Sequence, residues 1–466
     1  MNIYDTIAAI STPHGKGGVA VIRVSGTDAI PICERVFFPK SGKTLSALPS
    51  NMTVYGEIRM RPQGATVPSC IDDGMAVCFR APRSFTGEDT VEISCHGGIL
   101  VTGQVLSAIL AVGARQAEAG EFTRRAFING KLNLTEAEAL GSLLEAKTQG
   151  QLLLSRNGMN GLLSGELKGL YDNLCTIVTS VYAKIDFPDE DLAELTPGEI
   201  LDQLTHIQDR IRRLCDTYGT GRAVCEGIRT VICGRTNAGK SSLYNQLVGR
   251  QAAIVTDIAG TTRDLLEETV TVGHVMLRLC DTAGLRESDD PVERIGISRA
   301  REQIEQAECI LAVFDRSAVL TEEDRSLLDR LRASEIPVLI LLNKCDLDAA
   351  WETDELSGFA SENILTVSAS ENHGIERLRE RIEALFLDGT LDLRSDAIIT
   401  NARQYAALSR AATHISDALC AAQASFSEDV SCVDLELAMS ALAEVDGRAV
   451  TEDIVSQIFS HFCVGK

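Results

Sequence analysis

Gly234 to Ser241 form a glycine-rich segment, Gly-Arg-Thr-Asn-Ala-Gly-Lys-Ser, whose residue types suit phosphate. Backbone N–H groups in such a loop, together with the N-terminus of the following helix, can surround anionic oxygens. Gly234 and Gly239 let the backbone approach closely, Lys240 supplies a point charge, and the Ser241 hydroxyl can ligate Mg²⁺. Taken alone, a glycine-rich turn without a ligand is the alternative. The further binding candidates of this loop are Asn237, Ala238 and Ser242.

Two later segments predict groups that contact the γ-phosphate. Gly-Thr-Thr-Arg-Asp ends at Asp264, and Asp-Thr-Ala-Gly begins at Asp281. The Asp281 carboxylate can hold Mg²⁺ through water, and the Gly284 N–H group can sense the γ-phosphate. Thr262 is the natural second Mg²⁺ ligand, with a structural turn threonine as the alternative. These two segments, with the four residues that precede the first, also supply Arg263 as a catalytic candidate and Thr256, Asp257, Ile258, Ala259, Gly260, Thr261, Thr282 and Ala283 as binding candidates.

Base recognition is predicted by Asn-Lys-Cys-Asp, which ends at Asp346 and follows an expected strand. The Asp346 carboxylate can accept two hydrogen bonds from the guanine N1–H and N2–H₂ groups, which adenine does not offer in this arrangement. Four motifs in this order indicate a GTPase. The remaining base-site candidates are Asn343, Lys344, Ser368, Ala369 and Ser370.

One absence affects the expected chemistry. Leu285 follows Gly284 at a position where signalling GTPases commonly carry a glutamine that orients the attacking water. Leucine cannot orient water. Another group must do so, and something other than a familiar arginine finger must stabilise the phosphoryl charge.

The elements that position these residues predict a multidomain α/β and α protein. Residues 1–118 form an expected mixed α/β N-terminal domain, and residues 119–222 and 389–466 form the two parts of an all-α helical domain. Residues 223–388 alternate strands and helices. This order predicts an inserted P-loop G domain with a parallel-rich sheet flanked by helices.

Local patterns place the elements more closely. Thr135 and Glu138 match a capping box, with Thr135 as the expected N-cap of a helix. Alternation and apolar runs predict strands at residues 19–24, 74–79, 230–234, 275–280, 309–315, 337–342 and 364–368.

Composition limits the class of partner. The 466 residues carry a net charge of −22, so the overall field does not attract nucleic acid, and any RNA contact must be local or shared with a more basic partner. The 14 cysteines include no CxxC pair, which favours reduced thiols in a cytosolic protein. We expect a cytoplasmic protein, because no apolar run is long enough to span a bilayer and no secretory signal is visible.

Segments outside the four GTPase motifs (the G motifs) indicate which kind of GTPase this chain is. They are Asp5-Thr-Ile, Ser84-Phe-Thr-Gly-Glu-Asp89, His96-Gly-Gly98, Gly120 to Phe127 and the terminal Phe462-Cys-Val-Gly-Lys466. With the G motifs, they make the chain resemble the MnmE (TrmE) family of tRNA-modification GTPases over essentially its whole length.

The resemblance implies a folate-binding N-terminal domain, a helical domain, an inserted G domain and a homodimer without a membrane association. It implies that an FAD-dependent partner of the MnmG type joins it in a heterotetramer or larger complex. Together they would add a carboxymethylaminomethyl or aminomethyl group to C5 of the wobble uridine of certain tRNAs. The one-carbon unit would come from 5,10-methylene- or 5-formyl-tetrahydrofolate.

The resemblance also implies hydrolysis linked to K⁺-dependent dimerisation of the G domains. Asn237, the carbonyl groups of Thr256 and Ile258, and Thr261 would ligate K⁺, and an all-oxygen shell suits such a hard cation. Ser241 and Thr262 would hold Mg²⁺. Glu293 would help to position water, although composition alone suggests a solvated helical glutamate there.

For folate, the resemblance implies Arg23, Glu92, Lys131 and Lys466 as binding residues. Cations suit the carboxylates of a folate glutamate tail, and the Glu92 carboxylate can pair with pterin N–H groups. Cys463 is a candidate nucleophile or acid–base group towards the uridine or the one-carbon adduct, with an ordinary C-terminal thiol as the alternative.

Two other functions stay open at this point. A ribosome-assembly type RNA-binding GTPase would share the G motifs, but such proteins usually carry a basic RNA-binding appendage, and the flanks here are acidic. A folate-sensing GTPase scaffold without its own modification chemistry is barely separated from the leading hypothesis, because that chemistry could reside in the partner.

Overall fold

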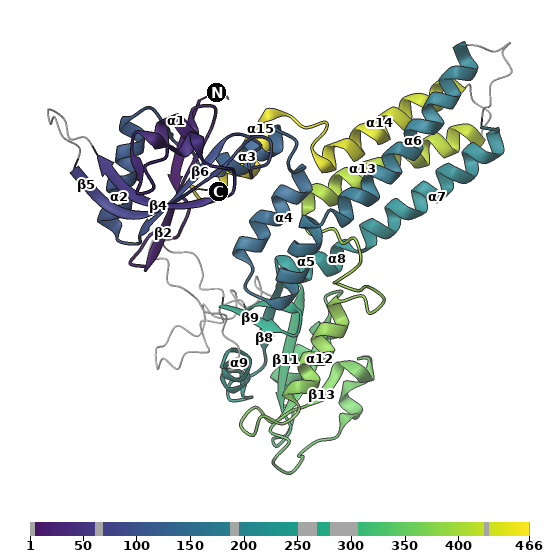
Figure 1. Cartoon of the computed structure of the whole chain (residues 1–466). Coiled ribbons are helices and arrows are strands. Elements are labelled where there is room, and N and C mark those ends of the chain that lie inside the picture. Colours follow the sequence, from purple (N-terminus) through teal and green to yellow (C-terminus); the bar gives the residue numbers. More distant parts are fainter. Residues whose placement is uncertain are drawn as a thin grey trace. The chain divides into compact units, whose positions relative to one another are not determined.

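The computed structural model describes residues 5–60, 69–186, 195–249, 268–279, 306–423 and 428–465. The chain divides into two compact units (Figure 1). The first comprises Met1–Gly141 and Ala443–Lys466, and the second comprises Ser142–Leu442. Among the described residues, no helix is both long and apolar enough to cross a bilayer. The expectation of a multidomain α/β and α protein is confirmed.

The first unit is built on a seven-stranded sheet with the order β3-β4-β5-β6-β2-β1-β7. Neighbouring strands are antiparallel, except that β1 pairs with β7 in parallel. The strands expected at residues 19–24 and 74–79 lie within β2 and β5. The strands are β1 (Ile7–Ile10), β2 (Val19–Ser25), β3 (Phe37–Pro39), β4 (Thr53–Met60), β5 (Ser69–Phe79), β6 (Thr90–His96) and β7 (Arg115–Gln116).

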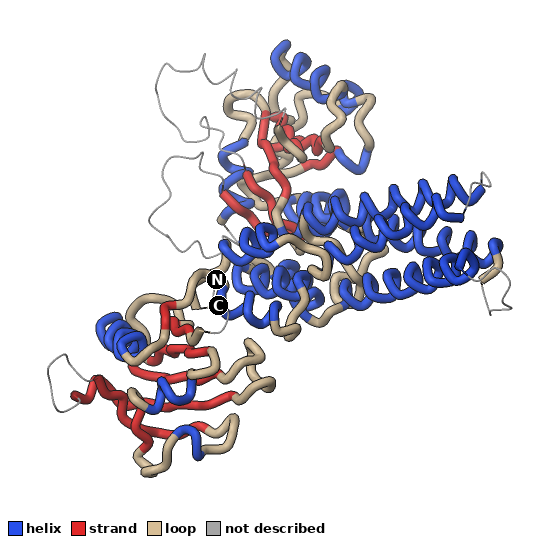
Figure 2. The backbone as a smooth tube through the Cα atoms, turned by 90° about the horizontal axis from the view of Figure 1, so that it is seen from above, coloured by secondary structure: helices blue, strands red, loops and turns tan. Residues whose placement is uncertain are grey.

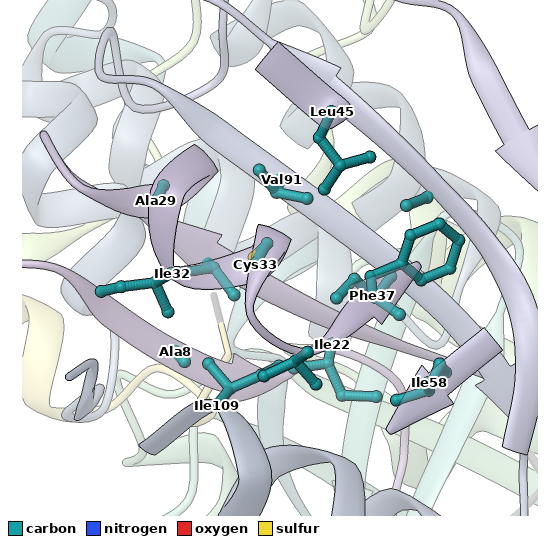
Figure 3. Close-up of a cluster of buried hydrophobic side chains, with 14 of the residues drawn as sticks. Ala8, Ile22, Ala29, Ile32, Cys33, Phe37, Leu45, Ile58, Val91 and Ile109 are labelled. Atoms are coloured by element: carbon teal, nitrogen blue, oxygen red, sulfur yellow. The ribbon is translucent and has the colours of Figure 1, made fainter. Parts of the chain in front are cut away.

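Apolar side chains from this sheet and its helices form the core of the first unit (Figure 3). Ile22 on β2, Ile58 on β4 and Ile109 on α2 are fully buried. Burying each such side chain contributes about 1.5–3 kcal/mol to folding. The helices of this unit are α1 (Ala29–Glu34), α2 (Ile99–Ala111), α3 (Glu121–Ile128), α4 (Leu134–Glu145, which runs into the second unit) and α15 (Glu452–Ser460).

The N-cap of helix α4 is Asn133, two residues before the expected cap Thr135. Asn133 Oδ1 accepts a hydrogen bond from the Glu136 backbone N–H group at 2.9 Å, and Glu136 Oε2 accepts one from the Asn133 N–H group at 3.1 Å. This reciprocal pair is the capping box. The prediction of Thr135 as the N-cap is therefore wrong, because asparagine serves this role as well as threonine does.

The second unit contains a six-stranded sheet with the order β13-β12-β11-β8-β10-β9. All neighbours are parallel except the antiparallel pair of β9 and β10. Along β11, Leu311 and Val313 pack on one face of the sheet while Ile310 and Phe314 pack on the other. Helices thus cover both faces. The strands are β8 (Ile228–Cys233), β9 (Glu268–Val272), β10 (Val275–Leu279), β11 (Cys309–Asp315), β12 (Val338–Asn343) and β13 (Ile364–Thr366).

Helices that precede the strands of this sheet in the sequence form a bundle with helices that follow them (Figure 2). In this bundle α7 packs along α13. Helix α7 begins with a capping box of Thr196 and Glu199 and carries Pro197 in its first turn. The described helices of the second unit are α5 (Gln149–Met159), α6 (Leu162–Asp186), α7 (Pro197–Asp216), α8 (Tyr218–Cys225), α9 (Lys240–Val248), α11 (Glu322–Arg332), α12 (Ile375–Phe386), α13 (Ala402–Gln423) and α14 (Glu428–Asp446, which runs into the first unit).

Candidate nucleotide and folate sites

The phosphate loop joins β8 to α9, and its two outer glycines are sterically required. Gly234 and Gly239 have φ angles of 139° and 99°, which favour glycine. A Cβ atom on Gly234 would lie 2.2 Å from the Val313 carbonyl oxygen, and one on Gly239 would lie 1.9 Å from Asn343 Nδ2. The loop is therefore a close-fitting backbone cradle that ends at the N-terminus of α9.

Lys240 and Asn237 present different groups from this loop. Lys240 Nζ donates to the carbonyl oxygens of Gly234 and Arg235, both at 2.8 Å, and burial lowers the pKa of the ammonium group. Asn237 is exposed and has a φ of 63°, a region that asparagine adopts more readily than most residues. Ala238 is buried, Ser241 is half-buried and Ser242 is exposed.

Asn343 ties the phosphate loop to the two loops that are predicted to contact the base. Its Nδ2 donates to the Ala238 carbonyl oxygen at 2.8 Å, and its Oδ1 accepts from the Ala369 N–H group at 3.0 Å. Asn343 is buried, so both bonds are shielded from water. The motif suggested Asn343 as a base-site residue, and the structure places its amide between the loops.

The loop after β12 is held by an ion pair that motif reasoning missed. Lys344 has a φ of 62°, and its Nζ donates to Asp315 Oδ2 at 2.7 Å. Burial alone would raise the pKa of the Asp315 carboxyl, but hydrogen bonds from Lys344 and Ser317 hold it below its ordinary value. The position of Asp315 at the end of an apolar strand was the available signal.

Asp346 and the loop after β13 complete the described base site. Asp346 is exposed, and the neighbouring Cys345 N–H group donates to the Val367 carbonyl oxygen at 3.2 Å. Ser368 and Ser370 face one another with hydroxyl oxygens 3.1 Å apart. These bonds hold the Asp346 loop beside the predicted last base-contacting loop.

The rest of the predicted nucleotide and metal site lies outside the described residues. Lys466 of the predicted folate site also lies outside them. The roles of all these residues stay predictions. The residues are Thr256, Asp257, Ile258, Ala259, Gly260, Thr261, Thr262, Arg263, Asp281, Thr282, Ala283, Gly284, Leu285, Glu293 and Lys466.

Two of the predicted folate residues contact each other. Arg23 on β2 and Glu92 on β6 are cross-strand partners, and two guanidinium nitrogens lie 2.8 Å from Glu92 Oε1. The guanidinium carbon also lies 5.3 Å from the centre of the Phe85 ring and 5.6 Å from that of Phe122. The exposed Lys131 donates to the Pro82 carbonyl oxygen at 3.0 Å.

The tail that carries Cys463 lies on the first unit. The Gly120 N–H group donates to the Cys463 carbonyl oxygen at 3.4 Å, and Ser11 Oγ donates to the Gly465 carbonyl oxygen at 3.0 Å. Gly465 has a φ of 99°, and a Cβ atom there would lie 2.3 Å from the Ile10 carbonyl oxygen. The backbone is thus fixed by contacts, while the Cys463 side chain is exposed.

A buried charge network beneath these segments was not predicted. Arg125 is 3% exposed and donates to the Asp5 carbonyl oxygen at 2.7 Å and to Asp5 Oδ1 at 2.6 Å. It also reaches Glu121 at 3.0 Å and Glu88 at 3.2 Å, and Arg115 pairs with both Asp5 and Glu121. Three of the short segments noted in the sequence therefore meet in one network.

A phosphate cradle ahead of α9, tied by Asn343 to an Asn-Lys-Cys-Asp loop on a mostly parallel sheet, defines a P-loop GTPase. Two family models match the chain, "MnmE helical domain" over residues 134–463 and "GTP-binding protein TrmE N-terminus" over residues 6–131. The chain belongs to the MnmE family of tRNA modification GTPases.

Curated relatives match the whole chain. The tRNA modification GTPase MnmE of Clostridioides difficile is 38% identical over 467 residues, covering 100% of both chains. That of Bacillus cereus is 41% identical over 465 residues, covering 99% of this chain and 100% of the relative. The MnmE of Bacillus velezensis is 41% identical over 464 residues with the same coverage. The predicted family is confirmed.

Proposed function

We propose that this chain, a GTP hydrolase of tRNA modification, uses K⁺-stimulated hydrolysis to drive folate-dependent modification of C5 of the wobble uridine. An FAD-dependent partner would share the chemistry, and the active form would be a cytoplasmic homodimer. The observation that carries the proposal is that relatives match the whole chain, including its two ends, and not the G domain alone. This separates the chain from a ribosome-assembly GTPase that shares only the G motifs.

The described half of the nucleotide site fits GTP with Mg²⁺. Gly234 and Gly239 leave no room for side chains, so the loop presents backbone N–H groups to phosphate. Lys240 Nζ, held by two loop carbonyl oxygens, would turn to the outer phosphates, and Ser241 would ligate Mg²⁺. The bound metal would neutralise charge on the phosphates during transfer.

The K⁺ proposal is supported by the backbone of Asn237. Its left-handed conformation and exposure leave the carboxamide oxygen available at the phosphate loop. A cation there would supply positive charge at a place where other GTPases use arginine. Carbonyl groups of Thr256 and Ile258 and the Thr261 hydroxyl would complete the oxygen shell, and Thr262 would join Ser241 at Mg²⁺. Glu293 and Arg263 would assist the attacking water.

The folate proposal is supported by the first unit. Arg23 and Glu92 pair beside two aromatic rings, an environment that suits a flat heterocycle with N–H donors and a charged tail. Lys131 and Lys466 would bind the glutamate carboxylates. Cys463, exposed on a tail that is fixed to the same unit, would act on the uridine or the one-carbon adduct.

Nucleoside analysis of tRNA tests the proposal in cells that lack the protein. Complementation with the intact gene is expected to restore the C5-modified wobble uridine, whereas Cys463→Ser should not, although its GTP hydrolysis stays near normal. Cys175→Ser is the matched control, because Cys175 is also an exposed free thiol. If modification persists in cells that carry only Cys463→Ser, the thiol is dispensable. If deletion leaves the uridine modified, the proposed function is wrong.

A further inference from the structure

Three potential metal ligands, none of which is assigned to GTP or folate, meet between two helices of the bundle. The ligand atoms of His414, Asp417 and Asp434 all lie within 4.8 Å of one another. His414 and Asp417 are three residues apart on α13, so they project from one face of that helix. Asp434 comes from α14, which runs beside α13 (Figure 1).

The imidazole of His414 is incompletely satisfied within the described part of the chain. Its Nδ1 atom is buried and has no hydrogen-bond partner there. Asp434 Oδ1 lies 3.9 Å from Nδ1, which is beyond hydrogen-bond reach. Two ligands that bind one tetrahedral ion at about 2.1 Å lie about 3.4 Å apart. The gap is thus too wide for a hydrogen bond, and a small rotation of the two side chains would bring it to the spacing of a shared ion.

We propose that His414, Asp417 and Asp434 form a binding site for a divalent transition metal of the Zn²⁺ type. One imidazole nitrogen and two carboxylate oxygens suit Zn²⁺ and its first-row neighbours, whereas Mg²⁺ and K⁺ prefer oxygen alone. Three protein ligands leave a fourth position for water. The ion would fix α14 to α13 and stabilise the bundle, and the site does not depend on the proposed folate chemistry.

A second cluster of the same residue types provides a comparison. Among the described residues, Asp72, Asp73 and His96 also lie within ligand distance of one another. There, however, His96 Nδ1 already lies 2.8 Å from Asp72 Oδ1, and the His96 side chain is 70% exposed. Because that imidazole nitrogen has a direct partner, the cluster needs no ion to satisfy it and serves as a control.

Metal binding by the full-length protein tests the site. EDTA would remove bound metal from the protein, and its thiols would be reduced. The protein would then be dialysed against low Zn²⁺ with excess Mg²⁺, so that Mg²⁺ occupies its own proposed position in the nucleotide site. We expect His414→Ala to lose one equivalent of bound Zn²⁺ and the accompanying rise in Tm, while His96→Ala keeps both. Co²⁺ would report the ligand type, since its visible spectrum distinguishes imidazole and carboxylate ligands from thiolates.

Asp434→Asn preserves side-chain volume and guards against misfolding of the alanine variant. It should also lose the equivalent of Zn²⁺ while its far-ultraviolet circular dichroism is unchanged. Equal Zn²⁺ binding and equal Tm shifts in the intact protein, His414→Ala and Asp434→Asn would overturn the proposal. A Co²⁺ spectrum that shows only thiolate ligands would do so too.

Discussion

The Asn343 side-chain amide donates to the Ala238 carbonyl oxygen at 2.8 Å, which couples the loop after β12 to the phosphate loop between β8 and α9. Asn343 Oδ1 also accepts from the Ala369 N–H group, so one buried side chain sets the spacing of three loops. Because a buried amide cannot exchange these bonds for water at low cost, the relative placement of the loops is defined before nucleotide binds.

Gly239→Ala should abolish GTP binding. The new Cβ atom would meet Asn343 Nδ2 at 1.9 Å, and the φ of 99° disfavours alanine. Equilibrium binding of a fluorescent GTP analogue measures the effect. The control is Gly169→Ala inside α6, where a Cβ atom meets nothing within 4 Å. That change should leave binding intact and stabilise the helix by up to about 1 kcal/mol. Normal binding by Gly239→Ala would contradict the packing described here.

Asn237→Ala should remove the advantage of K⁺ over Na⁺ in GTP hydrolysis, with a loss of about ten- to a hundredfold in kcat in K⁺. Asn237→Gly separates ligand loss from backbone strain, because glycine keeps the φ of 63° without a carboxamide. It should match the alanine variant. Asn51→Ala, which also changes an asparagine with a left-handed φ but in the first unit, should hydrolyse GTP normally. Equal wild-type rates in K⁺ and Na⁺ would refute the assignment.

Asp346→Asn should weaken GTP binding about ten- to a hundredfold, because each lost hydrogen bond to a charged group costs about 1.5–3 kcal/mol. Xanthosine triphosphate should gain relative affinity, since its C2 carbonyl group accepts from the asparagine amide. Competition binding with GTP, ATP and xanthosine triphosphate measures this. Asp348→Asn, an exposed neighbour two residues on, should change nothing. Unchanged purine discrimination by Asp346→Asn would rule out its role.

Arg125→Met should destabilise the first unit by about 3–5 kcal/mol, because it removes a buried guanidinium group that three carboxylates share. Urea unfolding measures the loss. Arg35→Met removes an exposed arginine whose guanidinium group donates to the Val112 carbonyl oxygen, and it should cost less than about 1 kcal/mol. Similar losses for both variants would show that the buried network contributes little.

The same network gives stability a defined pH dependence. Hydrogen bonds from Arg115 and then from Arg125 lower the pKa of Asp5. Burial alone would raise the pKa of Glu121, but the hydrogen bonds that Glu121 accepts, from Arg115 first, hold it below its ordinary value. The stabilisation from lowered carboxyl pKa values is complete above the ordinary values of 3.8 and 4.5. It is lost as the pH falls through the lower folded-state values. Acid titrations should therefore show a smaller loss of stability on acidification in Arg125→Met than in the intact protein; parallel curves would argue against this linkage.

Most strands of the six-stranded sheet could be predicted from the sequence, because their signals are local. Apolar runs such as residues 309–315 define a strand that is buried on both faces, and the motif residues follow directly at strand ends. The N-cap of α4 was misplaced, because Asn133 and Thr135 are both good caps and only the backbone decides between them.

Long-range pairings were not predictable from one sequence. Asp5, Glu88 and the α3 pair of Glu121 and Arg125 lie in three separate segments with ordinary composition, and only the fold of the first unit joins them. The pairing of Arg23 with Glu92 likewise depends on the register of β2 and β6. Local patterns specify helices and strands, whereas register and loop placement depend on packing.

The bond between Ser11 and Gly465 joins residues that are 454 positions apart in the chain. The ribosome must therefore synthesise the whole second unit before the first unit acquires α15 and the Cys463 segment. Closing so long a loop slows assembly more than it weakens the final state. During translation the first unit therefore stays incomplete until residues 443–465 have followed the second unit.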